Sequence, residues 1–146
     1  MVKKTFLVLI CFIGLIIFVS TLHGQGSKKT ITLPSGEVVW DLNGEWDVIV
    51  ENYDEWQRFG TYPQVFKIIQ EGSSFTGIRL KDNPPPTPGA AGSNCVEGEL
   101  DKSGFKKIEI IGGAWGIYPA KGQISEDGNK INIDAPQRSR HTWTRK

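Results

Sequence analysis

One cysteine and one histidine in the second half of the chain have side chains that could form a catalytic pair. Cys95 follows a Pro-rich segment, and His141 opens the last apolar-alternating run. A thiolate activated by an imidazole is a nucleophile, but a single thiol beside Val96 is more often a packing residue or a handle for an intermolecular disulfide. The sequence contains no G-x-S-x-G, H-E-x-x-H, C-x-x-C or Gly-rich phosphate-binding motif. We therefore expect no catalytic residue, no cofactor and no enzyme activity.

Charged residues give no stronger indication of a site. With two histidines, one of them His23, a multi-histidine metal centre is excluded, and no metal is expected. Arg138 and Arg140 could bind an acidic group of a ligand, and the alternative is a solvated loop. The 17 Lys+Arg are scattered among 16 Asp+Glu, which argues against a nucleic-acid partner. Four carboxylates on outward strand faces indicate solubility: Asp47, Glu97, Glu99 and Glu109.

Aromatic residues gather in two segments, 52–64 and 112–118, and are the candidate binding residues. We call these six the aromatic rim: Tyr53, Trp56, Phe59, Tyr62, Trp115 and Tyr118. Aromatic rings with polar tips suit a binding site, because they supply both contact area and hydrogen bonds. The alternatives are a lid that folds inward over a small core, and a contact with a membrane surface.

The first 26 residues have the pattern of a signal peptide. Lys3 and Lys4 precede a run of fourteen residues without a polar side chain, 6–19, and Gly24 and Gly26 offer a small-x-small cleavage pattern. Such a run is short for a membrane span. The sequence thus predicts a signal peptide over 1–26, a polar lead-in over 27–39 and a domain over 40–146. The mature protein is expected to be periplasmic or extracellular, and the alternative is a membrane anchor formed by an uncleaved leader.

The rest of the chain reads as short strands. Residues 45–51 place Trp46, Val48 and Val50 on one face and acidic residues on the other, which is the period of a half-buried strand. Similar runs predict eight strands in all, over 45–51, 65–70, 75–80, 95–101, 105–111, 117–125, 130–134 and 141–145. Seventeen Gly and eight Pro agree with strands joined by turns rather than with a helical bundle. The predicted class is all-β.

The lengths of the connections favour a barrel over a sandwich. Tight turns over 71–74, 102–104 and 126–129 alternate with longer connections over 52–64, 81–94, 112–116 and 135–140. In an up-and-down meander the tight turns share one end, here called the tight-turn end, and the others share the long-loop end. A Greek-key sandwich has no reason to alternate in this way. The sequence therefore predicts one eight-stranded antiparallel up-and-down barrel, with apolar residues inside.

Three short segments resemble the calycin superfamily of lipocalins, fatty-acid-binding proteins and avidins. The segment 41–46, Asp-Leu-Asn-Gly-Glu-Trp, is similar to its G-x-W opening, and 66–77 is similar to the second hairpin of small bacterial lipocalin-like proteins. The segment 141–145 resembles the last strand, where the family packs an Arg over the G-x-W tryptophan. The resemblance implies a secreted lipocalin-like barrel with Arg145 over Trp46 as a structural plug at the tight-turn end. No avidin-type biotin site can be carried over.

The topology leads to the same pair, because Trp46 and Arg145 belong to the first and last strands, which are neighbours in a closed meander. A guanidinium over an indole contributes about 0.5–2 kcal/mol.

The predicted function is non-enzymatic binding of a small apolar or amphipathic ligand at the long-loop end. The alternative is a protein-interaction module, such as an envelope accessory or inhibitor, that uses the aromatic rim on a protein partner. Eight strands enclose a space that side chains fill or that holds one small ligand. We expect a monomer, with membrane contact only through an uncleaved leader.

Overall fold

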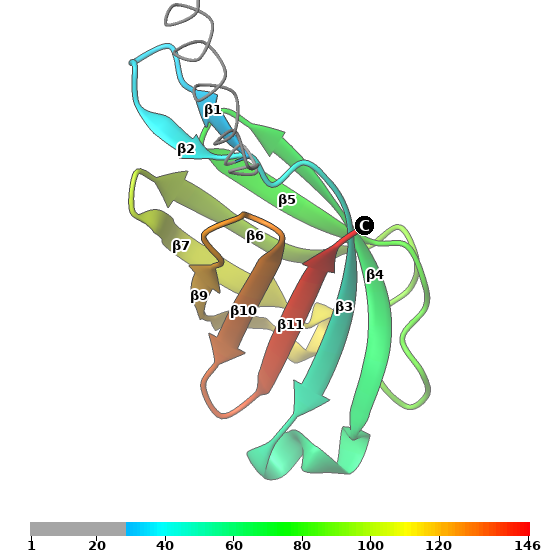
Figure 1. Cartoon of the computed structure of the whole chain (residues 1–146). Helices are drawn as coiled ribbons and strands as arrows, with labels where there is room; N and C mark the ends of the chain where they lie inside the picture. The colour runs from blue at the N-terminus through cyan, green and yellow to red at the C-terminus, as the bar shows by residue number, and fades with distance from the viewer. Residues whose placement is uncertain (1–28) are drawn as a thin grey trace, which may run out of the picture.

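The computed structural model describes residues 29–146, which form an all-β fold with two short 3-10 helices (Figure 1). The predicted signal peptide, residues 1–26, lies outside the described residues. Within residues 29–146, no helix has the length and apolar character needed to cross a bilayer. The elements are β1 (Thr30–Thr32), β2 (Val38–Trp40), β3 (Gly44–Asn52), η1 (Asp54–Phe59), β4 (Thr61–Glu71), β5 (Ser74–Arg79), β6 (Asn94–Asp101), β7 (Gly104–Ile111), η2 (Gly113–Trp115), β8 (Ile117–Pro119), β9 (Lys121–Ile124), β10 (Lys130–Ala135) and β11 (Ser139–Arg145).

The strands β3 to β11 form one antiparallel sheet of nine strands that curls into a nearly closed barrel (Figure 1). The spatial order is β8-β7-β6-β5-β4-β3-β11-β10-β9, so its two end strands are consecutive in the chain. Between them, Ala120 donates its backbone N–H to the carbonyl of Ile108 in β7 over 3.0 Å. The predicted all-β class is confirmed, and this sheet is compatible with a calycin-like barrel.

One predicted strand is divided in the structure. The run 117–125 forms two short strands, because β8 pairs with β7 whereas β9 pairs with β10. The break follows Pro119, which has no N–H to continue a ladder. The sheet therefore has nine strands where the sequence predicts eight.

A hairpin occupies most of the segment that was expected to be a polar lead-in. Strands β1 and β2 pair with each other and not with the barrel, and they lie over one of its ends (Figure 1). Glu37 accepts a hydrogen bond from the backbone N–H of Lys102, 3.0 Å away, in the β6–β7 turn. Val39 and the following Leu42 are buried in the core. The tight-turn end is thus covered by the chain's own N-terminal segment.

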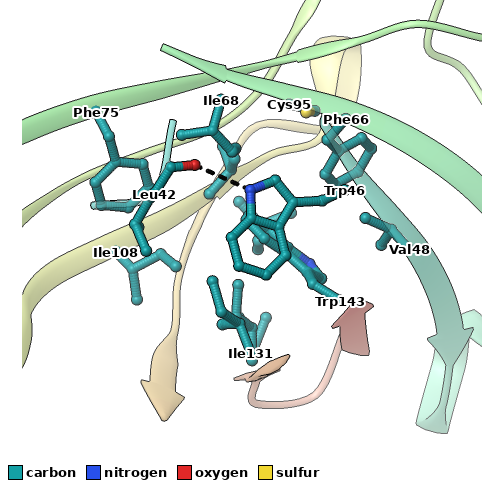
Figure 2. Close-up of a cluster of buried hydrophobic side chains, with 14 of the residues drawn as sticks. Leu42, Trp46, Val48, Phe66, Ile68, Phe75, Cys95, Ile108, Ile131 and Trp143 are labelled. Carbon is teal, nitrogen blue, oxygen red and sulfur yellow. Dashed lines mark hydrogen bonds between the residues drawn. The ribbon is translucent and has the colours of Figure 1, made fainter. Parts of the chain in front are cut away.

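Period-two alternation builds the core. Along β3, Trp46, Val48 and Val50 are buried, while Asp47 and Ile49 between them are exposed. The buried apolar side chains of β3 and β11 meet those of β4 to β7 and β10 in one cluster (Figure 2). The largest are Trp46 and Trp143, whose ring centroids lie 6.1 Å apart. Bulky residues therefore fill the barrel toward the tight-turn end.

Candidate functional site

Four of the six residues of the predicted aromatic rim pack together at the long-loop end. Trp56 and Phe59 come from η1, Trp115 comes from η2, and Tyr118 comes from β8. The ring centroid of Trp115 lies 4.9 Å from that of Trp56 and 4.8 Å from that of Phe59. Tyr118 meets Trp56 edge-on and donates its hydroxyl to the Trp115 carbonyl. These four half-buried side chains are called the aromatic lid below.

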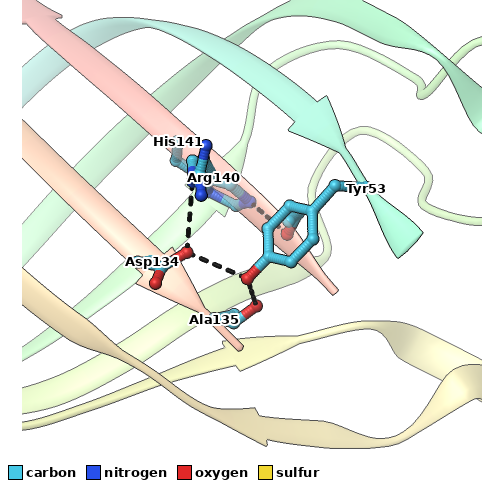
Figure 3. Close-up of polar contacts among 6 residues, drawn as sticks. Tyr53, Asp134, Ala135, Arg140 and His141 are labelled. Atoms are coloured by element: carbon cyan, nitrogen blue, oxygen red, sulfur yellow. Dashed lines mark hydrogen bonds and ion pairs between the residues drawn. The ribbon is translucent and has the colours of Figure 1, made fainter. Parts of the chain in front are cut away.

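The other two rim residues lie apart from the lid. The Tyr53 hydroxyl lies 2.9 Å from a carboxylate oxygen of Asp134 and 2.7 Å from the Ala135 carbonyl (Figure 3). Burial and Asp134 raise the pKa of Tyr53. Tyr62 falls inside β4 rather than in the loop and lines a cavity under the lid. Burial raises its pKa, against the opposing charges of Arg79 and Arg138.

Arg138 lies directly beneath the lid, on the β10–β11 turn. It is 6% exposed, and the central carbon of its guanidinium lies 3.5 Å from the ring centroid of Trp56. The same carbon lies 4.7 Å from the ring centroids of Trp115 and Tyr118. Its Nη1 is buried without an acceptor in the described part of the chain. The solvated loop considered from the sequence does not apply to this arginine, whereas Arg140 is exposed and pairs with Asp134 (Figure 3).

A second arginine enters the same region from β5. Arg79 is 6% exposed, and its Nη1 donates to Ser93 Oγ over 3.0 Å and to the Asn94 carbonyl over 2.7 Å. Its Nη2 donates to the Ile111 carbonyl over 2.9 Å. Its Nε is buried and finds no acceptor among residues 29–146. Arg79 therefore anchors the end of the Pro-rich loop with one side of its guanidinium and leaves another donor unpaired.

A cavity of about 30 Å³ lies between these arginines and the core. Its lining combines apolar residues (Val50, Phe66, Ile110 and Ile111) with polar and ionisable ones: Asn52, Tyr62, Arg79, Asn83, Cys95, Arg138, Ser139 and His141. The Pro-rich loop closes one side through Thr87 and Pro88. Gln64 holds that loop in place, because its amide donates to Asn83 Oδ1 over 2.7 Å.

His141 is neutral at the pH of ordinary buffers. It is 5% exposed, and burial together with the charges of Arg79 and Arg138 lowers its pKa to about 3. Its Nε2 lies 3.1 Å from Ser139 Oγ, while its Nδ1 is buried with no partner in the described residues.

Cys95 and His141 both line the cavity, yet neither is prepared for catalysis. The thiol donates to the Gly77 carbonyl over 3.2 Å, and burial raises the pKa of Cys95 to about 12. A protonated thiol and an imidazole that resists protonation are the opposite of an activated nucleophile and its base. Among residues 29–146, no group of three His, Cys, Asp or Glu side chains could hold a metal ion.

The predicted plug residues meet at the other end of the barrel. Arg145 and Trp46 are direct partners on β11 and β3, and the guanidinium carbon lies 4.3 Å from the centroid of the Trp46 ring. Arg145 donates to the carbonyls of Asp41, Asn43 and Gly128. The indole Nε1 of Trp46 donates to the Leu42 carbonyl over 2.9 Å (Figure 2).

Sequence reasoning missed Arg79, although the chain carries a signal for it. In the run 75–80, Phe75 and Gly77 share the inward parity with Arg79, and all three are buried. A charged residue at an inward position of an alternating strand indicates a special environment. Along β11 the same alternation places His141 and Trp143 on the inward face, and both are buried.

No protein-family model, no curated protein and no solved structure matches this chain.

Proposed function

We propose that this chain is an exported, non-enzymatic binding protein that takes up a small amphipathic molecule at the long-loop end of its barrel. The observation that carries the proposal is the cavity beneath the aromatic lid, which lies next to two buried arginines. Polar side chains in the cavity, together with the lid rings that contact Arg138, suit a molecule with a polar head and an apolar body.

The two ends of the barrel support this location. At the tight-turn end, Leu42, Trp46 and Trp143 are fully buried and belong to the packed core, and the hairpin β1–β2 lies over that end (Figure 1). At the long-loop end the lid residues are only half-buried. Three of them come from two short 3-10 helices and Tyr118 comes from the three-residue strand β8, with no disulfide among residues 29–146 to fix them. Such a lid can open at lower cost than a strand of the sheet.

The chemistry of the cavity supports binding rather than catalysis. The pKa of Cys95 is raised to about 12 and that of His141 is lowered to about 3, so neither group exchanges a proton readily near neutral pH.

Native mass spectrometry of protein purified from its own host tests this function. The wild-type protein is expected to retain a small-molecule adduct, and Trp56→Ala is expected to lose it, since truncating a central aromatic costs about 2 kcal/mol of binding or more. Ile117→Ala is the matched control, because Ile117 adjoins η2 and is 58% exposed; this variant should keep the adduct.

A wild-type protein without any small-molecule adduct would contradict the proposal. If the mass instead fits a complex with a second protein chain, the protein-interaction alternative takes its place.

A further inference from the structure

We propose that the cavity under the aromatic lid is an oxyanion site, in which Arg79 and Arg138 bind a carboxylate or phosphate group of the ligand. This inference rests on the proposed function and narrows it to anionic molecules. Its basis is the pair of buried guanidinium groups, which have no opposite charge beside them among residues 29–146.

Among residues 29–146, neither arginine has a carboxylate partner. The ion pairs within residues 29–146 join Lys106 to Glu99, Lys107 to Glu109, Arg140 to Asp134 and Lys146 to Glu45, and all are largely on the surface. Arg79 and Arg138 are each 6% exposed. A buried cation is costly unless an opposite charge or a full set of hydrogen bonds compensates it. Two such cations beside one small cavity therefore indicate a binding role for an anion.

Three residues with an unpaired buried nitrogen line this cavity. Arg79 Nε, Arg138 Nη1 and His141 Nδ1 are three of the four buried side-chain nitrogen or oxygen atoms without a hydrogen-bond partner in the described residues. All three residues line the same cavity. The fourth is the indole nitrogen of Trp143, on the strand that also carries His141. Native proteins leave few buried polar groups unpaired. The nitrogens of Arg79 and Arg138 can only donate, so two unpaired guanidinium donors on residues of one cavity point to a ligand with acceptor atoms.

The remaining lining can assist an anion but cannot neutralise the arginines. Asn52, Tyr62 and Ser139 contribute amide and hydroxyl donors, and within the described part of the chain no Asp or Glu lines the cavity. Guanidinium groups are suited to carboxylates and phosphates, because their planar donors match two oxygens of one group. An oxyanion from outside would supply both the missing charge and the missing acceptors.

The position of the lid sets the orientation of the ligand. The guanidinium of Arg138 stacks on Trp56 with one face, and its edge carries the unpaired Nη1. The space of about 30 Å³ suits one small polar group and not a hydrocarbon chain. An anionic head would therefore occupy the cavity. The apolar body of the ligand would lie against the lid rings, or take their place when the lid opens.

Isothermal titration calorimetry with matched eight-carbon probes tests the site. Octanoate and octyl phosphate carry the two anionic groups, and 1-octanol has the same tail without a charge. At least one of the anions is expected to bind at least tenfold more tightly than 1-octanol. Acetate and inorganic phosphate, titrated alone, distinguish a free anion from an anionic head on an apolar body. If acetate or inorganic phosphate binds as tightly as the corresponding octyl compound, the ligand of the site is a free anion.

Two variants assign the effect to the buried charge. Arg138→Met removes the guanidinium but keeps most of the length of the side chain. It should lower the affinity for the anionic probes at least tenfold and leave the affinity for 1-octanol unchanged. Arg140→Met removes a neighbouring exposed charge and should leave all affinities unchanged. The comparison of octanoate with 1-octanol on the wild-type protein needs no variant.

If 1-octanol binds as tightly as both anions, the oxyanion site is wrong while the proposed binding of small amphipathic molecules stands. If none of these probes binds, the oxyanion site is also wrong, and the native mass measurement then decides whether the binding function survives.

Discussion

The barrel contains two arginines stacked on tryptophans, one at each end, and their surroundings differ. At the tight-turn end, Arg145 covers Trp46 at 4.3 Å and donates hydrogen bonds to three backbone carbonyls. At the long-loop end, Arg138 lies 3.5 Å from the ring of Trp56, and its Nη1 has no acceptor among residues 29–146. Stacking is common to both pairs, but only the first arginine has its donors used by the fold.

This difference separates a structural role from a binding role. A saturated guanidinium stabilises the folded chain, because its removal leaves carbonyls without a donor. An unsaturated buried guanidinium costs stability in the unliganded protein and is compensated only when an acceptor arrives. The same side-chain pair can therefore close one end of a barrel and prepare the other end for a ligand.

The largest effect expected of a substitution is at the tight-turn end. Trp46→Ala should lower the free energy of unfolding by about 3–5 kcal/mol, because a fully buried indole leaves a cavity among Leu42, Phe66 and Trp143. Urea denaturation measures this loss. Trp115→Ala, in the half-buried lid, is the matched control, and its free energy of unfolding should fall by clearly less. Equal losses at both positions would remove the distinction between a packed end and a lid.

The next prediction is a loss of stability at acid pH, caused by His141 at the long-loop end. The pKa of His141 is about 3 in the folded protein against an ordinary value of 6.5, so the unfolded chain binds the proton more readily. Stability is fully present above about pH 6.5 and is lost as the pH falls toward 3, by about 5 kcal/mol in total.

Urea denaturation at several pH values tests this, with His141→Gln as the control that should flatten the profile between these limits. An identical pH dependence in wild type and variant would show that the imidazole is not held neutral by burial and by the two arginines.

A smaller loss is expected for Arg145→Met. The carbonyls of Asp41, Asn43 and Gly128 lose their donor, which should cost about 1–3 kcal/mol in denaturant unfolding. In a double-mutant cycle with Trp46→Ala, the two losses should differ from additivity by about 0.5 kcal/mol or more. Strict additivity would mean that the stacking between the two residues contributes nothing to stability.

The sequence predicts the tight-turn end better than the long-loop end, for a physical reason. Alternation along β3 and β11 places Trp46 and Arg145 on neighbouring strands, and the pairing of those strands follows from the closed meander. Strand positions were likewise readable, except where Pro119 divides 117–125 into β8 and β9. The hairpin β1–β2 was missed because its few apolar residues only bury against the finished barrel.

At the long-loop end, side chains from separate connections meet only in three dimensions. The sequence indicates that Trp56 and Trp115 share one end, but not that Arg138 lies beneath them. Tyr53 was expected with them, and it turns toward Asp134 instead. Loop conformation depends on specific contacts, such as those of Gln64 and Arg79 with the Pro-rich loop, and periodicity carries no information on these.

The most direct test of the contrast between the two arginines is the free energy of unfolding of Arg138→Met, measured with and without octanoate. We predict that, without octanoate, the variant loses no more than about 0.5 kcal/mol, because removing an unpaired buried charge offsets the lost stacking. We also predict that octanoate stabilises the wild type and not the variant. A loss of about 2 kcal/mol or more without octanoate, comparable to that of Arg145→Met, would contradict the account and make both arginines structural.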